Sequence, residues 1–219
     1  MGLPITETRT DRADADRRRH AIHRTLREVF GLAEFRPGQV EVIEAALEGR
    51  DAIAIMPTGA GKSLCYQIPA LHLPGTTVVV SPLIALISDQ TARLGGLGLD
   101  ASQIDSSRTS RERDAAIDDV RHERLEFVLT TPERLSDPEF VNLLRRIAVD
   151  LVVVDEAHCI SQWGHDFRPA YLGLGAVAEA LGHPPVLALT ATATARTKAD
   201  IAKRLGLRDP RHNNRQRYP

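Results

Sequence analysis

A glycine-bearing turn between an apolar run and a helical segment constrains this chain more than any other stretch. It lies within residues 52–65, which read A-I-A-I-M-P-T-G-A-G-K-S-L-C. The apolar run predicts a buried strand, and the glycines let backbone N–H groups surround an anion without a Cβ in the way. A helix that starts at Lys62-Ser63 adds unpaired amide donors and its dipole. Strand, turn and helix in this order predict a site for the phosphates of a nucleoside triphosphate.

Individual residues of this motif have predictable roles. Lys62 is placed to reach the β- and γ-phosphates, and the Ser63 hydroxyl is placed to ligate Mg²⁺. The loop that would surround the phosphates consists of Thr58, Gly59, Ala60 and Gly61. The strict form of the motif has glycine where Met56 stands, so the match is to a looser form. The alternative is a glycine turn that only joins a strand to a helix.

Short apolar runs alternate with helical patterns along the rest of the chain. Strands are predicted at residues 77–80, 102–104, 127–130, 151–154 and 186–189. Helices are predicted at residues 20–30, 37–47, 83–97, 110–120 and 193–205. This alternation predicts an α/β fold with a central, mostly parallel sheet and helices on both faces. Ligands bind such sheets beyond the carboxyl ends of the strands, which is where the polar motifs of this sequence fall.

Composition and charge set the remaining limits. A chain of 219 residues with a net charge of −1 predicts one domain without a general attraction to nucleic acid. We expect a polar, disordered lead at residues 1–19, an ATP-binding domain at 20–210 and an irregular tail at 211–219. Cys65 and Cys159 do not have metal-ligand spacing, so neither a disulfide nor a zinc site is expected. No apolar run approaches the ~18 residues of a membrane span. We expect no membrane partner and a cytoplasmic location, nucleoid-associated if the source is bacterial.

A second motif follows the predicted strand at residues 151–154. The run L-V-V-V-D-E places Asp155 and Glu156 at the strand's carboxyl end. We predict that Asp155 binds Mg²⁺ together with Ser63 and that Glu156 orients and deprotonates the attacking water. An acidic pair after an apolar run can also be a capped strand end. The phosphate loop earlier in the same predicted sheet favours the metal interpretation.

Further motifs carry a family resemblance. They are F-R-P-G-Q at 35–39, M-P-T-G-A-G-K-S-L-C-Y-Q at 56–67, S-P-L-I-A-L-I-S-D-Q at 81–90, T-P-E-R-L at 131–135, D-E-A-H-C-I-S-Q-W-G-H-D-F-R-P-A-Y at 155–171 and L-T-A-T-A-T at 189–194. In this order they resemble RecQ-type DNA helicases of superfamily 2, over about residues 26–210. The resemblance implies a RecA-like P-loop NTPase fold, with ATP and Mg²⁺ as cofactors. It also implies single-stranded DNA and duplex junctions as partners, and ATP hydrolysis coupled to unwinding in DNA repair and recombination.

The resemblance also implies roles for matching residues. Adenine would be recognised by Arg36 and Gln39. Coupling of the nucleotide site to DNA would fall to His158, Thr190 and Thr192. Residues 161–168 would form the family's aromatic-rich loop, in which the DNA-binding residues are Trp163, His165, Phe167 and Arg168. Bases stack on such aromatic faces with ~1–3 kcal/mol each; the alternative places both aromatic rings in the core. The DNA backbone would contact Ser81, Thr131 and Arg134, whose alternative roles are capping and turn formation.

The sequence departs from the family at three points. Leu32 stands where an aromatic residue usually stacks on adenine, and Ala60 replaces a glycine. The third departure is that the second RecA-like lobe is missing. That lobe supplies an arginine finger worth about 10³–10⁵ in rate, so we expect weak or absent hydrolysis and no unwinding by this chain alone. Three alternatives stay open: a stand-alone module that binds nucleotide or single-stranded DNA, a non-helicase P-loop ATPase switch, and a remnant that aggregates.

Overall fold

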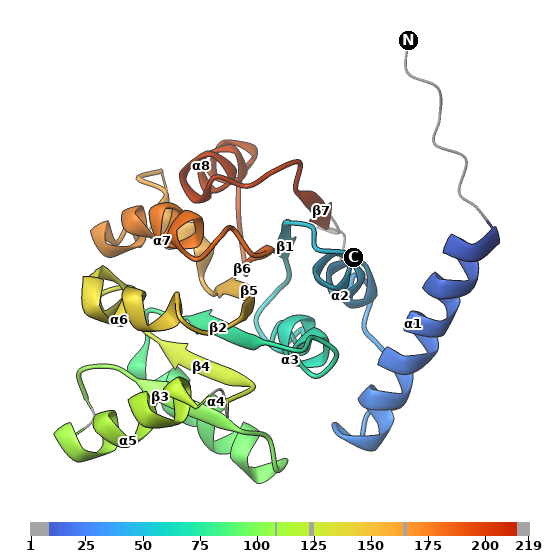
Figure 1. The fold of residues 1–219 in the computed structure, drawn as a ribbon. Helices are drawn as coiled ribbons and strands as arrows, with labels where there is room; N and C mark the ends of the chain where they lie inside the picture. Colours follow the sequence, from blue (N-terminus) through green and yellow to red (C-terminus); the bar gives the residue numbers. More distant parts are fainter. Residues whose placement is uncertain (1–8, 108, 123–124, 164–165, 214–219) are drawn as a thin grey trace. The chain divides into compact units, whose positions relative to one another are not determined.

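The computed structural model describes residues 9–107, 109–122, 125–163 and 166–213 (Figure 1). The chain divides into two compact units, Met1–Phe35 and Arg36–Pro219. The first unit contains the helix α1, Arg9–Glu28. The sequence predicts a helix from residue 20 onward, after a disordered lead at residues 1–19. The structure corrects this prediction, because the helix already begins at residue 9. Acidic and basic residues alternate at helical spacing here, as in the ion pair of Arg17 with Asp14, and such pairs support a polar helix.

The second unit is built on a parallel sheet. Its described residues form seven strands in the order β3-β4-β2-β5-β6-β1-β7 (Figure 1). The strands are β1 Ala52–Ile55, β2 Thr76–Val80, β3 Ala101–Ile104, β4 Phe127–Thr130, β5 Val149–Val154, β6 Val186–Thr190 and β7 Arg211–Asn213. All the strand pairs are parallel. The predicted α/β fold with a central parallel sheet is confirmed.

Helices cover both faces of the sheet. They are α2 Gln39–Leu47, α3 Leu64–Ala70, α4 Ile84–Gly96, α5 Ser110–Arg121, α6 Pro138–Leu144, α7 Leu174–Ala180 and α8 Ala195–Leu205. Alternate residues of the inner strands enter opposite cores, as period-2 side chains require. One core joins Ile53 and Val78 to side chains of α5 to α8, and the other joins Ala54 and Val79 to side chains of α2 to α4. The helices α6 and α7 were not predicted, because seven residues give too little periodicity.

The strand β7 corrects the expectation of an irregular tail. Residues 211–213 pair with β1 at the edge of the sheet. Asp51 holds this region together, because its carboxylate accepts hydrogen bonds from the backbone N–H of Val186 (2.8 Å) and of Arg208 (2.6 Å). An exposed edge strand needs no apolar pattern, which is why the sequence did not reveal it. Residues 214–219 lie outside the described part of the chain.

Short 3₁₀ helices follow two of the central strands and carry predicted site residues. They are η1 Arg134–Ser136 after β4, and η2 Ala157–Ile160 and η3 Pro169–Gly173 after β5. Among the described residues, no helix is both long and apolar enough to cross a membrane.

Candidate nucleotide and nucleic-acid site

The phosphate loop runs from the end of β1 to the start of α3. Gly59 and Gly61 both have φ of 79°, a left-handed conformation that glycine adopts without strain. The ammonium group of Lys62 lies 3.4 Å from the carbonyl oxygen of Met56, to which it donates. The sequence therefore places glycine at the two loop positions where the backbone conformation requires it.

Arg36 and Gln39 bind the phosphate loop directly. Gln39 is 1% exposed, and its Nε2 donates to the carbonyl oxygens of Gly61 (2.9 Å) and Ala60 (3.3 Å). Its Oε1 accepts the backbone N–H of Arg36 at 2.8 Å, and the Arg36 guanidinium donates to the carbonyl oxygen of Gly59. A Cβ added to Gly61 would lie 2.6 Å from Gln39 Nε2. These two residues therefore hold the loop's conformation, while their recognition of adenine stays a prediction.

Asp155 and Glu156 follow β5, which neighbours β6 and, beyond it, β1. Asp155 is 6% exposed. Burial, and then the nearby charge of Glu156, raise the pKa of its carboxyl group to about 6, although Lys62 opposes the shift. Glu156 has φ of 48° and ψ of 44°, a left-handed conformation that is strained for a residue with a Cβ. Strain and unfavourable charge at one point are typical of functional sites.

The donor set at this point fits Mg²⁺. Magnesium prefers oxygen ligands, usually one or two carboxylates together with phosphate oxygens and water. The Asp155 carboxylate and the Ser63 hydroxyl supply such oxygens, from the end of β5 and from the start of α3. A divalent cation would also offset the negative charges of Asp155 and of Glu156, the neighbour that adds to the effect of burial on the pKa of Asp155.

The predicted coupling residues form one hydrogen-bonded chain. His158 Nδ1 lies 2.9 Å from Thr190 Oγ1 and 3.2 Å from Glu156 Oε2. The Thr190 hydroxyl donates to the carbonyl oxygen of Thr192 at 3.1 Å. Because the single hydroxyl proton is used there, Thr190 Oγ1 accepts its bond from His158 Nδ1–H. The structure thus connects Glu156 to the end of β6, while a coupling role for this chain stays a prediction.

The predicted aromatic loop presents one ring to solvent. Trp163 is 59% exposed, whereas Phe167 is half-buried. The guanidinium of Arg196, on α8, lies 3.3 Å from the centroid of the Trp163 ring. No local pattern brings Arg196 and Trp163 together, so this contact could not be predicted from the sequence. His165 lies outside the described residues.

Arg168 ties the aromatic loop to two neighbouring segments. Its guanidinium donates to the carbonyl oxygen of Pro82, two residues after β2, at 3.1 Å. Its backbone N–H donates to the carbonyl oxygen of Cys159 at 2.9 Å.

Tyr171 is a further residue of the site for which no role was predicted from the sequence. Its buried hydroxyl donates to the carbonyl oxygen of Asp155 at 3.0 Å, so this side chain joins η3 to the acidic pair.

The three residues predicted to contact the DNA backbone are largely enclosed. Ser81 is 1% exposed and Thr131 is 6% exposed. Among the described residues, the buried Ser81 hydroxyl has no hydrogen-bond partner. Arg134 pairs with Asp137, and its guanidinium lies 4.8 Å from the centroid of the Phe140 ring. In this structure Arg134 makes intramolecular contacts, and its contact with DNA stays a prediction.

Comparison with known proteins agrees with this geometry. Residues 36–201 match the family model of the DEAD/DEAH box helicases. The chain is 46% identical over 185 residues to the ATP-dependent DNA helicase RecQ of Pasteurella multocida, covering 84% of this chain and 29% of that protein. It is 44% identical over 200 residues to the probable ATP-dependent DNA helicase RecS of Bacillus subtilis, covering 90% of this chain and 40% of that protein. The chain thus spans well under half the length of these relatives.

A solved structure shares the fold. The DEAD-box helicase Mss116 bound to ssRNA and UDP-BeF has a TM-score of 0.69 and 22% identity to this chain, over 88% of this chain and 42% of that one. At this identity the likeness establishes the fold alone. It confirms the predicted RecA-like P-loop architecture.

Proposed function

This chain belongs to the DEAD/DEAH box helicase family, and we propose that it is the ATP-binding lobe of a RecQ-type ATP-dependent DNA helicase. The two relatives described above carry the name of ATP-dependent DNA helicases. Because the chain spans only 29% of one and 40% of the other, their activity is part of the proposal. We also propose a cytoplasmic location, with DNA as the partner.

One observation carries the proposal. The buried Asp155 and the strained Glu156 stand at the end of β5, and the phosphate loop follows β1 in the same sheet. Carboxyl ends of parallel strands share one edge, so the acidic pair and the loop face the same ligand. A phosphate cradle with a carboxylate pair beside it is the arrangement that phosphoryl transfer to water requires.

The residues would divide the reaction as follows. Backbone N–H groups of residues 58–61 bind the phosphates, and Lys62 offsets the negative charge of the β- and γ-phosphates. Mg²⁺, when bound, supplies positive charge at the phosphate oxygens; Asp155 and Ser63 would hold it. Glu156 accepts a proton from water as the water oxygen attacks the γ-phosphorus and the bond to the β,γ-bridging oxygen breaks. The products are ADP and inorganic phosphate.

Single-stranded DNA would be bound by the aromatic loop. Trp163 offers an exposed ring on which a base can stack, at ~1–3 kcal/mol. Loop and acidic pair are physically linked, since Arg168 is hydrogen-bonded to Cys159 and His158 lies beside Glu156. A change in the loop on binding single-stranded DNA would therefore reach the group that orients water. Duplex junctions are the proposed substrate of the complete enzyme.

Full activity would need a second RecA-like lobe as a partner. In phosphoryl transfer an arginine finger is worth about 10³–10⁵ in rate, and we propose that such a group comes from that second lobe. Hydrolysis by this chain alone is expected to be slow, and unwinding is expected to be absent.

The test is ATP hydrolysis with and without single-stranded DNA, in parallel with Glu156→Gln. Glu179→Gln on α7 is the matched control, because Glu179 is exposed and pairs only loosely with Arg208, at 3.8 Å. We expect slow turnover that DNA stimulates, that Glu156→Gln abolishes and that Glu179→Gln leaves unchanged. Nucleotide binding without turnover would instead favour a stand-alone binding module. Turnover that is indifferent to DNA would favour a P-loop ATPase switch and contradict the helicase proposal.

A further inference from the structure

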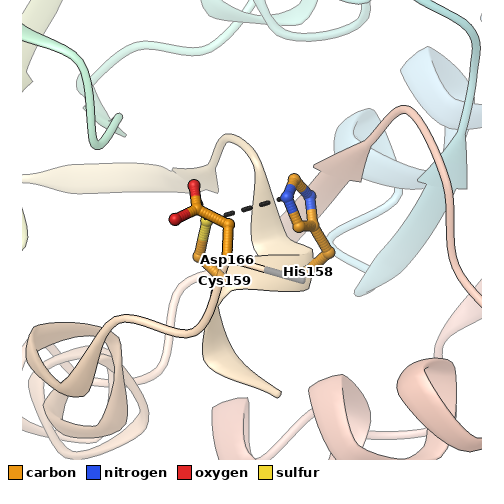
Figure 2. A group of neighbouring side chains, drawn as sticks. All are labelled: His158, Cys159 and Asp166. Carbon is orange, nitrogen blue, oxygen red and sulfur yellow. Dashed lines mark hydrogen bonds between the residues drawn. The ribbon is translucent and has the colours of Figure 1, made fainter. Parts of the chain in front are cut away.

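We propose that His158, Cys159 and Asp166 form a binding site for one thiophilic divalent cation of the zinc class, separate from the proposed magnesium site. Within the described part of the chain, these residues are the one group of His, Cys, Asp and Glu whose ligand atoms converge closely enough to hold a metal, all within 4.8 Å of one another. Figure 2 shows the three side chains converging from η2 and from the loop that follows it.

The spacing of the donor atoms suits a tetrahedral metal. Cys159 Sγ lies 3.8 Å from His158 Nε2 and 3.7 Å from Asp166 Oδ2 (Figure 2). Bonds of zinc to sulfur, nitrogen and oxygen place neighbouring ligand atoms about 3.5 Å apart in tetrahedral geometry. These two separations are close to that value. The ligand atoms of His158 and Asp166 lie within 4.8 Å of one another, so this pair would have to approach by up to about 1.5 Å for all three to bind one metal.

The hydrogen-bond network leaves the correct histidine nitrogen available. His158 Nδ1 carries the proton, since it donates to Thr190 Oγ1 and faces Glu156 Oε2. In neutral imidazole the other nitrogen, Nε2, then has a free lone pair, and this atom faces Cys159. A carboxylate on the outer nitrogen of a metal-binding histidine fixes the ring and raises its basicity. Glu156 stands in that position.

Charge and hydrogen bonding at Cys159 also favour a cation. The thiol has one proton but faces two acceptors, His158 Nε2 and Asp166 Oδ2. A divalent cation would replace that proton, which leaves for solvent, and would satisfy all three side chains at once. The cation's charge of +2 is offset by the thiolate and the Asp166 carboxylate. The Arg168 guanidinium also donates to Asp166 Oδ2, at 3.4 Å, so the metal would take the place of this contact or use the other carboxylate oxygen. The side chain of Asp166 is 57% exposed, which provides the entry path and a position for a water ligand.

The ligand types select the metal class. A thiolate and an imidazole favour zinc and its neighbours, whereas a carboxylate with a hydroxyl favours magnesium. The spacing of Cys65 and Cys159 suggested no zinc site in the sequence. This site uses one cysteine only and depends on the fold to bring Asp166 back to η2.

Cobalt spectroscopy of the full chain, freed of any affinity tag, tests the proposal without relying on ATP hydrolysis. Co²⁺ bound through a thiolate gives a near-ultraviolet sulfur-to-metal absorption band and, in tetrahedral geometry, intense visible bands. The chain has two cysteines, and Cys65 is buried elsewhere, in the core on the other side of the sheet. Cys65→Ser is therefore the matched control for Cys159→Ser.

We expect one equivalent of Co²⁺ to produce these bands, Zn²⁺ to bleach them, and Cys159→Ser to abolish them while Cys65→Ser retains them. Asp166→Asn, which keeps the side-chain shape, and His158→Gln should each weaken binding by more than about tenfold. Circular dichroism establishes that each variant is folded. The absence of these bands in the wild-type chain would overturn the proposal. Bands that survive both the Asp166 and the His158 substitutions would also overturn it, because the cobalt would then be bound by the Cys159 thiolate alone.

A functional consequence rests on the proposed ATPase activity. A bound metal would fix His158 and the loop that carries Asp166, so Zn²⁺ should slow DNA-stimulated hydrolysis in the wild type and not in Cys159→Ser. The two proposals can fail independently. The cobalt bands test the cation site without any ATP hydrolysis, and ATP hydrolysis measured without added zinc tests the ATPase activity without the cation site.

Discussion

Replacing Asp155 with asparagine should stabilise the nucleotide-free chain while removing its capacity to hold Mg²⁺. Burial and the charge of Glu156 raise the pKa of Asp155 from 3.8 to about 6. That difference, at 1.36 kcal/mol for each pKa unit, corresponds to at most about 3 kcal/mol of folding free energy at pH 8. Asparagine has the same shape and no charge, so it should recover much of that energy.

The sign of the pH dependence follows from linkage. Because the folded pKa is raised, the unfavourable contribution of Asp155 is absent below pH 3.8, where the carboxyl group is neutral in both states. It grows as the pH rises from 3.8 toward about 6 and is complete above that value. The advantage of Asp155→Asn in free energy of unfolding should therefore be largest at pH 8 and fall to about half near pH 5.

Urea denaturation of both proteins in EDTA, at pH 5 and at pH 8, measures this difference. ATP hydrolysis, measured separately with Mg²⁺ and without EDTA, should be lost in the variant. Two outcomes would refute the reasoning: equal stability of wild type and variant at pH 8, or a gain of the same size at both pH values. Equal stability would mean that the charge of Asp155 is well solvated in the folded chain, and an equal gain at both pH values would mean that the gain does not come from that charge.

Three further predictions follow from contacts in the structure. Gly61→Ala should destabilise the chain by at least about 1 kcal/mol, since φ at this residue is left-handed. It should also weaken binding of a fluorescent ATP analogue, because the new Cβ displaces Gln39 from the loop. Unchanged binding of the analogue would contradict this reasoning. Arg196→Ala should uncover the ring of Trp163, the only tryptophan. At high salt, where phosphate attraction is screened, single-stranded DNA should then quench its fluorescence at up to about fivefold lower concentration, whereas unchanged quenching would count against the contact. Asp51→Ala should lower the free energy of unfolding by about 2–6 kcal/mol in urea, since two backbone amides lose their acceptor; a loss below about 1 kcal/mol would show that water replaces the carboxylate.

Much of this fold could be predicted because local patterns and sheet geometry agree. The apolar runs that became β1, β2, β4, β5 and β6 are buried on both faces, and such strands are visible as continuous apolar segments. Short amphipathic helices and an exposed edge strand lack such a signal, so α6, α7 and β7 were missed. The helix α1 was predicted too short, because its first turns have nothing apolar to mark them.

The sequence by itself determined the phosphate loop, the acidic pair at the end of β5 and the succession of buried strands along the chain. Each of these is written in consecutive residues, whose chemistry and backbone conformation act locally. Only the tertiary structure decided that Gln39 holds the loop, that Arg196 covers Trp163, and that Asp166 returns to His158 and Cys159. These contacts join residues from separate elements, and their distances depend on how helices and loops pack on the sheet, which no local pattern encodes.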